Sequence, residues 1–161
     1  MPNKISIAVD PGYDRIGIAV FENAKLVHSE CFTPPKGEFP VRLSAIYRHV
    51  TTAIRTYNPK TLAIETLFLT KNQKTAMKVA EARGVIQLAA AENGLEITEY
   101  SPQAVKIAVT GSGNAHKDAV IRMVERLTPP PKQNRHDDEY DAIALGIAHT
   151  ATLGILGNIH K

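Results

Sequence analysis

The sequence predicts one α/β domain, from residue 1 to residue 161, built on a mixed five-stranded sheet with helices on both faces. Three short β-like segments come first, separated only by turns, and strand-like and helix-like segments alternate after them. Closely spaced strands form antiparallel hairpins, whereas strands joined by helical crossovers run parallel. We therefore expect an antiparallel meander followed by parallel strands.

The first half of the chain follows this plan. Apolar residues alternate with polar or small ones in three segments, and the turn-like P-G-Y-D and E-N-A-K separate them; the expected strands are 4–9, 15–21 and 25–32. After a loop, P-P-K-G-E-F-P, apolar residues from Leu43 to Tyr57 keep the helical spacing. That helix ends at Asn58, because the residue before a proline is disfavoured in the helical region.

The second half alternates strands and helices. A strand is expected at 61–65, an alanine-rich helix at 72–93 and a further strand at 95–100. Ser101 caps a helix that Gly111 closes. Asn114 is expected to cap another helix, which ends at Leu127. A proline-rich loop then leads to a last helix, which begins near Asp137.

Composition narrows the class of protein. The formal net charge is +3, from 19 Lys+Arg against 16 Asp+Glu, which agrees with a nucleic-acid partner but is weak evidence alone. The single cysteine, Cys31, excludes an internal disulfide and a cysteine-based zinc cluster. Apolar runs are far shorter than the ~20 residues that cross a bilayer, and we expect no secretory signal, because the first residues, M-P-N-K-I-S, carry no apolar segment. We expect a cytoplasmic protein without a membrane partner.

Two acidic residues end predicted strands. Asp10 closes the first strand and Glu65 closes the fourth. Ligands of open α/β sheets bind beyond the carboxyl ends of parallel strands, so neighbouring strands would bring these carboxylates side by side. An Asp before Pro-Gly is also an ordinary turn residue. Glu65 favours a functional site, because a carboxylate that continues a buried strand is costly unless it is paired or metal-bound.

Further acids open the last predicted helix in H-D-D-E-Y-D. Asp138 and Asp141 are spaced i, i+3 and share one face. Asp137 is i, i+4 from Asp141 and remains an alternative to Asp138. Acids at this place also stabilise a helix through its dipole, so the position alone does not assign a function.

If these carboxylates converge, two divalent ions would cancel their charge of −4. Oxygen ligands suit Mg²⁺, with Mn²⁺ as a substitute, rather than zinc. Two such ions about 3.5–4 Å apart are typical of in-line phosphodiester hydrolysis. The sequence therefore predicts a two-ion nuclease site on Asp10, Glu65, Asp138 and Asp141.

Basic residues flank this predicted site. Three lysines lie on one stripe near the start of the long helix, with Arg83 further along it, and two more lysines follow the fifth strand. Such stripes are often solvated surfaces, but beside a nuclease site they would hold backbone phosphates. An aromatic residue in L-F-L-T is either a core residue or a wedge against bases. The candidate DNA contacts are Phe68, Lys71, Lys74, Lys78, Lys106 and Lys117.

Four segments, in order, carry a family resemblance: I-A-V-D-P-G-Y-D-R-I-G-I-A-V, L-A-I-E-T-L-F-L-T-K-N, A-R-G-V and H-D-D-E-Y-D-A-I-A-L-G-I-A-H. From Lys4 to about His149 the chain resembles the RuvC-type Holliday-junction resolvases. The second and last segments are the specific ones. In the first segment, Ile18-Ala19 stands where members often carry an aromatic and a small residue, and we expect this to affect packing only.

The resemblance implies a ribonuclease H-like fold and a homodimeric, Mg²⁺-dependent endonuclease that cuts two opposed strands of a four-way DNA junction symmetrically. It implies the same four catalytic acids, a junction-probing role for Phe68 and DNA contacts by Lys106 and Lys117. The long helix would contribute to the dimer, and the resemblance also suggests a branch-migration machine as a further partner. Some members carry histidine at the first position of the Asp137-Asp138 pair.

Three other functions remain open at this point. A ribonuclease H-like nuclease on another substrate, such as a ribosomal RNA precursor, would use the same acids. An actin-like or sugar-kinase domain also opens on an acidic D-x-G hairpin, but it needs a second lobe for which 161 residues leave no room. A junction-binding protein without cleavage would lack one of the acids, and all four are present.

Overall fold

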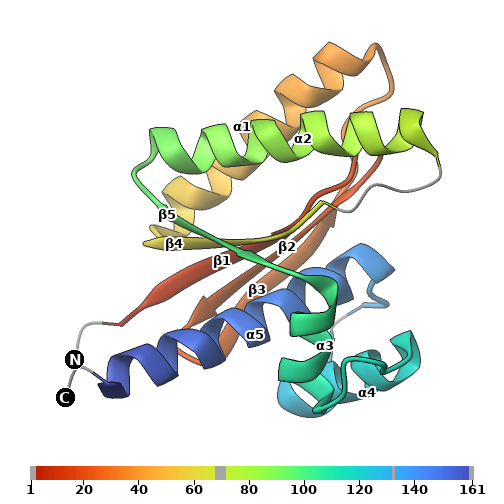
Figure 1. Ribbon diagram of the computed structural model, residues 1–161. Helices are drawn as coiled ribbons and strands as arrows, with labels where there is room; N and C mark the ends of the chain where they lie inside the picture. The colour runs from red at the N-terminus through yellow and green to blue at the C-terminus, as the bar shows by residue number, and fades with distance from the viewer. Residues whose placement is uncertain (1–2, 68–71, 132, 160–161) are drawn as a thin grey trace.

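The computed structural model describes residues 3–67, 72–131 and 133–159. Its strands and helices follow the order expected from the sequence (Figure 1). The elements are β1 (Ile5–Asp10), β2 (Ile16–Glu22), β3 (Lys25–Phe32), α1 (Phe39–Tyr57), β4 (Thr61–Glu65), α2 (Gln73–Glu92), β5 (Glu96–Tyr100), α3 (Pro102–Thr110), α4 (Lys117–Leu127) and α5 (Asp137–Ile159).

The five strands form one sheet in the order β3-β2-β1-β4-β5. β1 and β2 pair antiparallel, as do β2 and β3, and they form the meander. β4 pairs parallel with β1 on one side and with β5 on the other. The predicted mixed sheet is confirmed.

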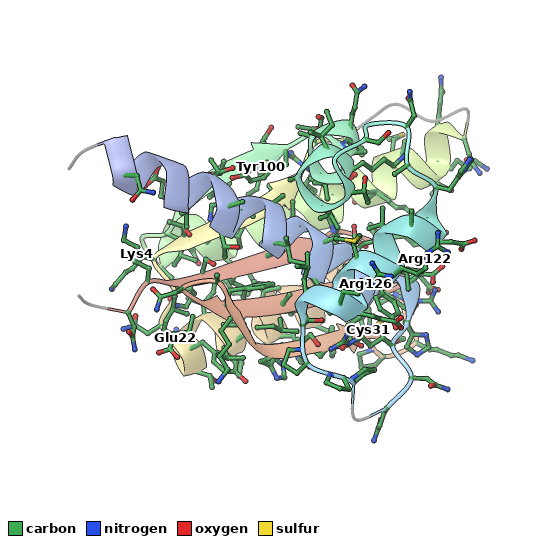
Figure 2. All side chains as sticks on the ribbon, turned by 90° about the horizontal axis from the view of Figure 1, so that it is seen from below. Lys4, Glu22, Cys31, Tyr100, Arg122 and Arg126 are labelled. Carbon is green, nitrogen blue, oxygen red and sulfur yellow. The ribbon has the colours of Figure 1, made fainter. Side chains whose placement is uncertain are left out.

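Helices cover both faces of this sheet (Figure 1), as expected. Large side chains such as Ile7 and Val9 of β1 pack against α1 and α2. The residue between them, Ala8, faces the other side and packs with α3, α4 and α5. This alternation follows from the two-residue period of a strand. Figure 2 looks onto the second face, where α5 lies across the strands with α3 and α4 beside it.

Small residues line the sheet beneath α5. Ala8, Ala19 and Ala63 are buried there, and a Cβ atom on Gly17 would collide with the main-chain carbonyl of Asp138. The missing side chain at position 17 therefore lets the first turn of α5 lie directly on β2. This close approach positions the acidic start of α5 next to the end of β1.

His149 fixes the middle of α5 to two strands. Its Nε2 lies 2.7 Å from the hydroxyl of Thr61 on β4, and its Nδ1 lies 2.8 Å from the hydroxyl of Tyr100 on β5. The imidazole is 1% exposed. Burial lowers the pKa of His149 from 6.5 to about 4, so the ring is neutral at physiological pH and bonds both hydroxyls.

Several strand and helix ends differ by one residue from the sequence prediction, and the starts of α1 and α4 differ by more. α1 begins at Phe39 and includes Pro40 in its first turn, which a helix tolerates because the first N–H groups have no intrahelical partner. α4 begins at Lys117 with His116 at the N-cap position and without a side-chain cap bond. The expectation that Asn114 caps this helix was wrong; the main-chain N–H of Asn114 instead donates to the hydroxyl of Ser112.

In the described parts of the chain, no helix is long and apolar enough to cross a membrane.

Candidate active site

Asp10 and Glu65 are the last residues of two neighbouring parallel strands, β1 and β4. The register pairs Val9 with Ile64, so Asp10 and Glu65 are the next residues on each strand. By strand alternation both carboxylates point to the face on which α5 lies. The predicted neighbourhood of these two acids is therefore present in the structure.

The other two acids come from the first turns of α5. Asp10 is the ladder partner of Gly17, and Gly17 lies against the backbone of Asp138. The contact between α5 and β2 thus brings Asp138 and Asp141 to the carboxyl ends of β1 and β4. Asp141 also lines a pocket of about 230 Å³ together with Glu65.

The acids raise one another's pKa values. The pKa of Asp10 is well above its ordinary value, first because of burial and then because of the negative charges of Asp141, Glu65 and Asp138. Burial and the charge of Asp141 raise the pKa of Glu65, against an opposing effect of Lys106. The pKa of Asp141 is raised by burial, while Lys117 opposes the shift. The site therefore concentrates negative charge that its own basic groups only partly compensate.

Two basic side chains pair with the acids of α5. Arg15 Nε donates to Asp138 Oδ2 at 3.0 Å. Lys117 Nζ lies 3.1 Å from a carboxylate oxygen of Asp137 and 3.7 Å from one of Asp141. Burial lowers the pKa of Lys117, but the hydrogen bond to Asp137 and the nearby carboxylates more than offset this and raise it.

Asp137 and Asp138 face different surroundings. The side chain of Asp138 is 24% exposed, and its negative charge contributes to the raised pKa of Asp10. The side chain of Asp137 is 66% exposed, and its carboxylate reaches Lys117. The geometry thus favours Asp138 over Asp137 as the partner of Asp10, a distinction that the sequence left open.

The donor set of these four acids fits a hard divalent cation, because every candidate ligand atom is a carboxylate oxygen. The mutually raised pKa values indicate that added positive charge would be stabilising there. Within the described residues, however, no three His, Cys, Asp or Glu side chains already form a metal cage. Arg15 Nε lies 3.0 Å from Asp138 Oδ2 and Lys117 Nζ lies 3.7 Å from Asp141 Oδ2, so these basic groups and a metal ion would share the same carboxylates.

The candidate DNA contacts fall into three groups. Lys106 and Lys117 line the 230 Å³ pocket beside Glu65 and Asp141, at the acids themselves. Lys74 and Lys78 are exposed on α2, and Lys78 Nζ also lies 5.3 Å from the ring of Tyr13 and 5.7 Å from that of Phe39. Phe68 and Lys71 lie outside the described residues.

Sequence reasoning missed Arg15 and Arg42 altogether and missed the partners of Arg83. Arg15 pairs with Asp138 across 123 positions of sequence. Arg42 of α1 donates to the carbonyls of Tyr13 and Asp14 in the loop after Asp10. Arg83 was expected among the basic groups around the site, but it binds the main-chain carbonyl of Glu65 and the carboxylate of Glu99. Nothing in the local sequence could identify these partners.

Comparison with known proteins gives consistent results. The family model described as crossover junction endodeoxyribonuclease RuvC matches residues 6–149. A protein of that description from Brachyspira hyodysenteriae is 43% identical over 160 residues, which cover 96% of this chain and 99% of the relative. One from Moorella thermoacetica is 41% identical over 150 residues, 90% of each chain.

Solved structures agree with this comparison. The structure of Thermus thermophilus RuvC in complex with Holliday junction substrate superposes with a TM-score of 0.84 at 28% identity, over 94% of this chain and 96% of that one. The yeast mitochondrial Holliday junction resolvase Ydc2 has a TM-score of 0.62 at 11% identity, over 98% of this chain and 85% of that one, and so shares the fold. The predicted ribonuclease H-like fold is confirmed. The chain belongs to the RuvC family of crossover junction endodeoxyribonucleases.

Proposed function

We propose that this chain resolves four-way DNA junctions by two symmetric, metal-dependent phosphodiester cuts. The observation that carries the proposal is the meeting of Asp10, Glu65 and Asp141, with raised pKa values, where β1, β4 and α5 converge. The related Thermus thermophilus protein has been solved with Holliday junction substrate, which supports the same substrate here.

We infer that Asp10, Glu65, Asp138 and Asp141 hold two Mg²⁺ ions, with Mn²⁺ able to substitute. When bound, such ions activate a water nucleophile and stabilise the leaving oxygen of the phosphodiester. Asp10 and Glu65 contribute fixed positions, because each ends a strand that is paired on both sides. Arg83 adds to this by binding the main-chain carbonyl of Glu65 at 3.1 Å.

The basic residues would hold the cut strand. Lys106 and Lys117 line the same pocket as Glu65 and Asp141, where they could receive backbone phosphates beside the reacting bond. Lys74 and Lys78 add exposed basic groups on α2, which packs on the other face of the sheet. Phe68 belongs to the proposal through the family resemblance, and Lys71 belongs to it through the basic stripe in the sequence.

Two symmetric cuts require two copies of the site, so we propose a homodimer. The long helix α2 exposes two large apolar side chains, Met77 at 64% and Leu88 at 52%. They are eleven positions apart, about three helical turns, and so lie on one face of α2. The matching test is sedimentation: the wild type is expected to be dimeric, and Leu88→Glu is expected to shift it toward the monomer. A monomeric wild type that still makes paired cuts would contradict this assembly.

The activity is tested with a synthetic four-way junction whose arms carry distinct labels. Purified protein with Mg²⁺ is expected to place paired, symmetric nicks on opposed strands, and a chelator is expected to abolish them. Linear duplex, single-stranded RNA and an RNA–DNA hybrid serve as competitors in the same reaction. A preference for any RNA substrate, or cleavage that survives the chelator, would reject the proposed function.

A further inference from the structure

Arg15 lies at the rim of the acidic site. It immediately precedes β2 and follows Asp10 by five positions. Its Nε–H is bonded to Asp138, and its side chain is 44% exposed. Within the part of the chain that the structure describes, this is the one hydrogen bond that the guanidinium makes, so its remaining N–H donors are available to a ligand.

The backbone beneath Arg15 is held firmly. Arg42 Nη2 donates to the carbonyl of Asp14 at 3.1 Å and to its carboxylate at 3.0 Å, and Lys78 lies over the ring of Tyr13. Gly12 allows a tight turn, because a Cβ atom there would collide with the carbonyl of Arg15. The backbone that carries Arg15 is thus ordered before any ligand binds. Less conformational entropy is therefore lost when the guanidinium makes a new contact.

The bond between Arg15 and Asp138 has two interpretations. Exposed ion pairs usually stabilise a fold by only about 0–1 kcal/mol, so this pair could be a minor surface contact. The carboxylate of Asp138 is, however, also one of the four that we assign to metal binding. A divalent ion and Arg15 therefore compete for the same carboxylate, and Arg15 becomes available when the ion binds.

We propose that Arg15 is a phosphate-binding residue of the cleavage site, held by Asp138 until metal binding releases it to the DNA strand. A guanidinium offers paired donors that match the oxygens of a phosphate. Arg15 is partly exposed and pairs with one of the acids, so a phosphate held at the acids would lie within reach of its guanidinium. The inference rests on the proposed nuclease function and adds a residue to its substrate contacts.

The test compares Arg15→Gln and Arg15→Lys with Arg55→Gln, which removes an exposed arginine near the end of α1, at the opposite end of the strands. The first measurement is Mn²⁺ binding by the DNA-free protein, followed as the signal of free Mn²⁺ in a titration. Arg15→Gln is expected to bind Mn²⁺ up to about fivefold more tightly, because the competing cation is gone. Arg55→Gln is expected to bind it as the wild type does.

The second measurement is single-turnover junction cleavage at saturating Mg²⁺. Arg15→Gln is expected to cut about tenfold more slowly or worse, and Arg15→Lys is expected to recover part of that loss. Tighter metal binding together with slower cleavage is a combination that lost structural support would not produce. Unchanged Mn²⁺ affinity or unchanged cleavage in Arg15→Gln would overturn the inference. A wild type that cuts no junction would instead reject the nuclease function, while the Mn²⁺ titration would still report on the competition.

Discussion

The main-chain carbonyl of Asp138 lies so close to Gly17 that any β-carbon at position 17 would collide with it. Gly17 is also the ladder partner of Asp10. The distance between the acid on the sheet and the acids on α5 is therefore set by a backbone contact that tolerates no side chain. Geometry at the site depends on packing as much as on the acids themselves.

Gly17→Ala is accordingly expected to push the start of α5 away from the sheet. We expect a loss of about 1–3 kcal/mol in the free energy of unfolding, in the range of over-packed interiors, and a larger relative loss in junction cleavage. Urea unfolding and single-turnover cleavage measure the two effects. Gly154→Ala is the control, since the added methyl group meets no neighbour and should stabilise the helix by up to about 1 kcal/mol. Wild-type cleavage by Gly17→Ala would show that this contact does not set the site.

Asp10→Asn is expected to reduce cleavage by about 100- to 1,000-fold while junction binding stays intact or becomes tighter. The substitution removes a candidate metal ligand worth several kcal/mol at the transition state, and it also removes negative charge that repels DNA. Gel-shift titration and cleavage assays on the same junction separate the two. Cleavage at the wild-type rate would exclude Asp10 as a metal ligand.

The raised pKa of Asp10 predicts a pH dependence of stability in chelator. The folded state holds the Asp10 proton more tightly than the unfolded state does, so the free energy of unfolding falls as pH rises from the ordinary carboxyl range through the raised pKa. Asp10→Asn lacks this proton. The advantage of Asp10→Asn in unfolding free energy over the wild type should therefore grow as the pH rises from the ordinary carboxyl range through the raised pKa of Asp10. A pH-independent difference would contradict the repulsion among these acids.

Lys106→Ala is expected to weaken junction binding and to reduce the slope of log K against log salt by about 1, the contribution of one phosphate contact. Lys60→Ala is the matched control, because Lys60 is exposed just before β4, at the opposite end of that strand from Glu65. Fluorescence anisotropy at several salt concentrations gives both slopes. Equal slopes for the two variants would remove Lys106 from the DNA contacts.

His149→Ala is expected to destabilise the fold by about 2–4 kcal/mol, because it removes a buried side chain and leaves the hydroxyls of Thr61 and Tyr100 without their partner. The pKa of His149 is lowered to about 4, so the unfolded state takes up a proton first as pH falls below 6.5. The stability difference between wild type and variant should therefore shrink between pH 6.5 and about pH 4. Chemical unfolding at several pH values checks this, and a constant difference would contradict it.

Sequence patterns were sufficient for the sheet and for the two acids on it. Alternation within β1 and β4, together with the rule for parallel strands, places Asp10 beside Glu65 without any coordinates. The sequence also predicted where α5 begins. It did not determine whether Asp137 or Asp138 turns toward the sheet. Both occupy the first turn of a helix, and the choice depends on how that helix packs against Gly17, which is a tertiary contact.

The other differences have the same origin. Asn114 is a good helix cap by residue type, yet the chain enters α4 two residues later, at His116. Lys78 belongs to a regular basic stripe, but its Nζ also lies over the rings of Tyr13 and Phe39. Both rings come from other parts of the chain, so the stripe does not predict this contact. Arg15 and Arg83 find partners far away in sequence. Local patterns carry no information about such pairs.

The alanines at positions 8, 19 and 63 form the floor on which α5 rests. Replacing any of them with valine or leucine would keep the core apolar and the protein folded. The larger side chain would, however, tilt α5, which carries two of the four carboxylates. In a randomised library screened for junction cleavage, variants with bulky residues at these three interior positions should be lost from the active pool. Their loss should be almost as complete as that of variants with neutral residues at the acids. Loss of catalysis would then arise from residues that never meet the substrate.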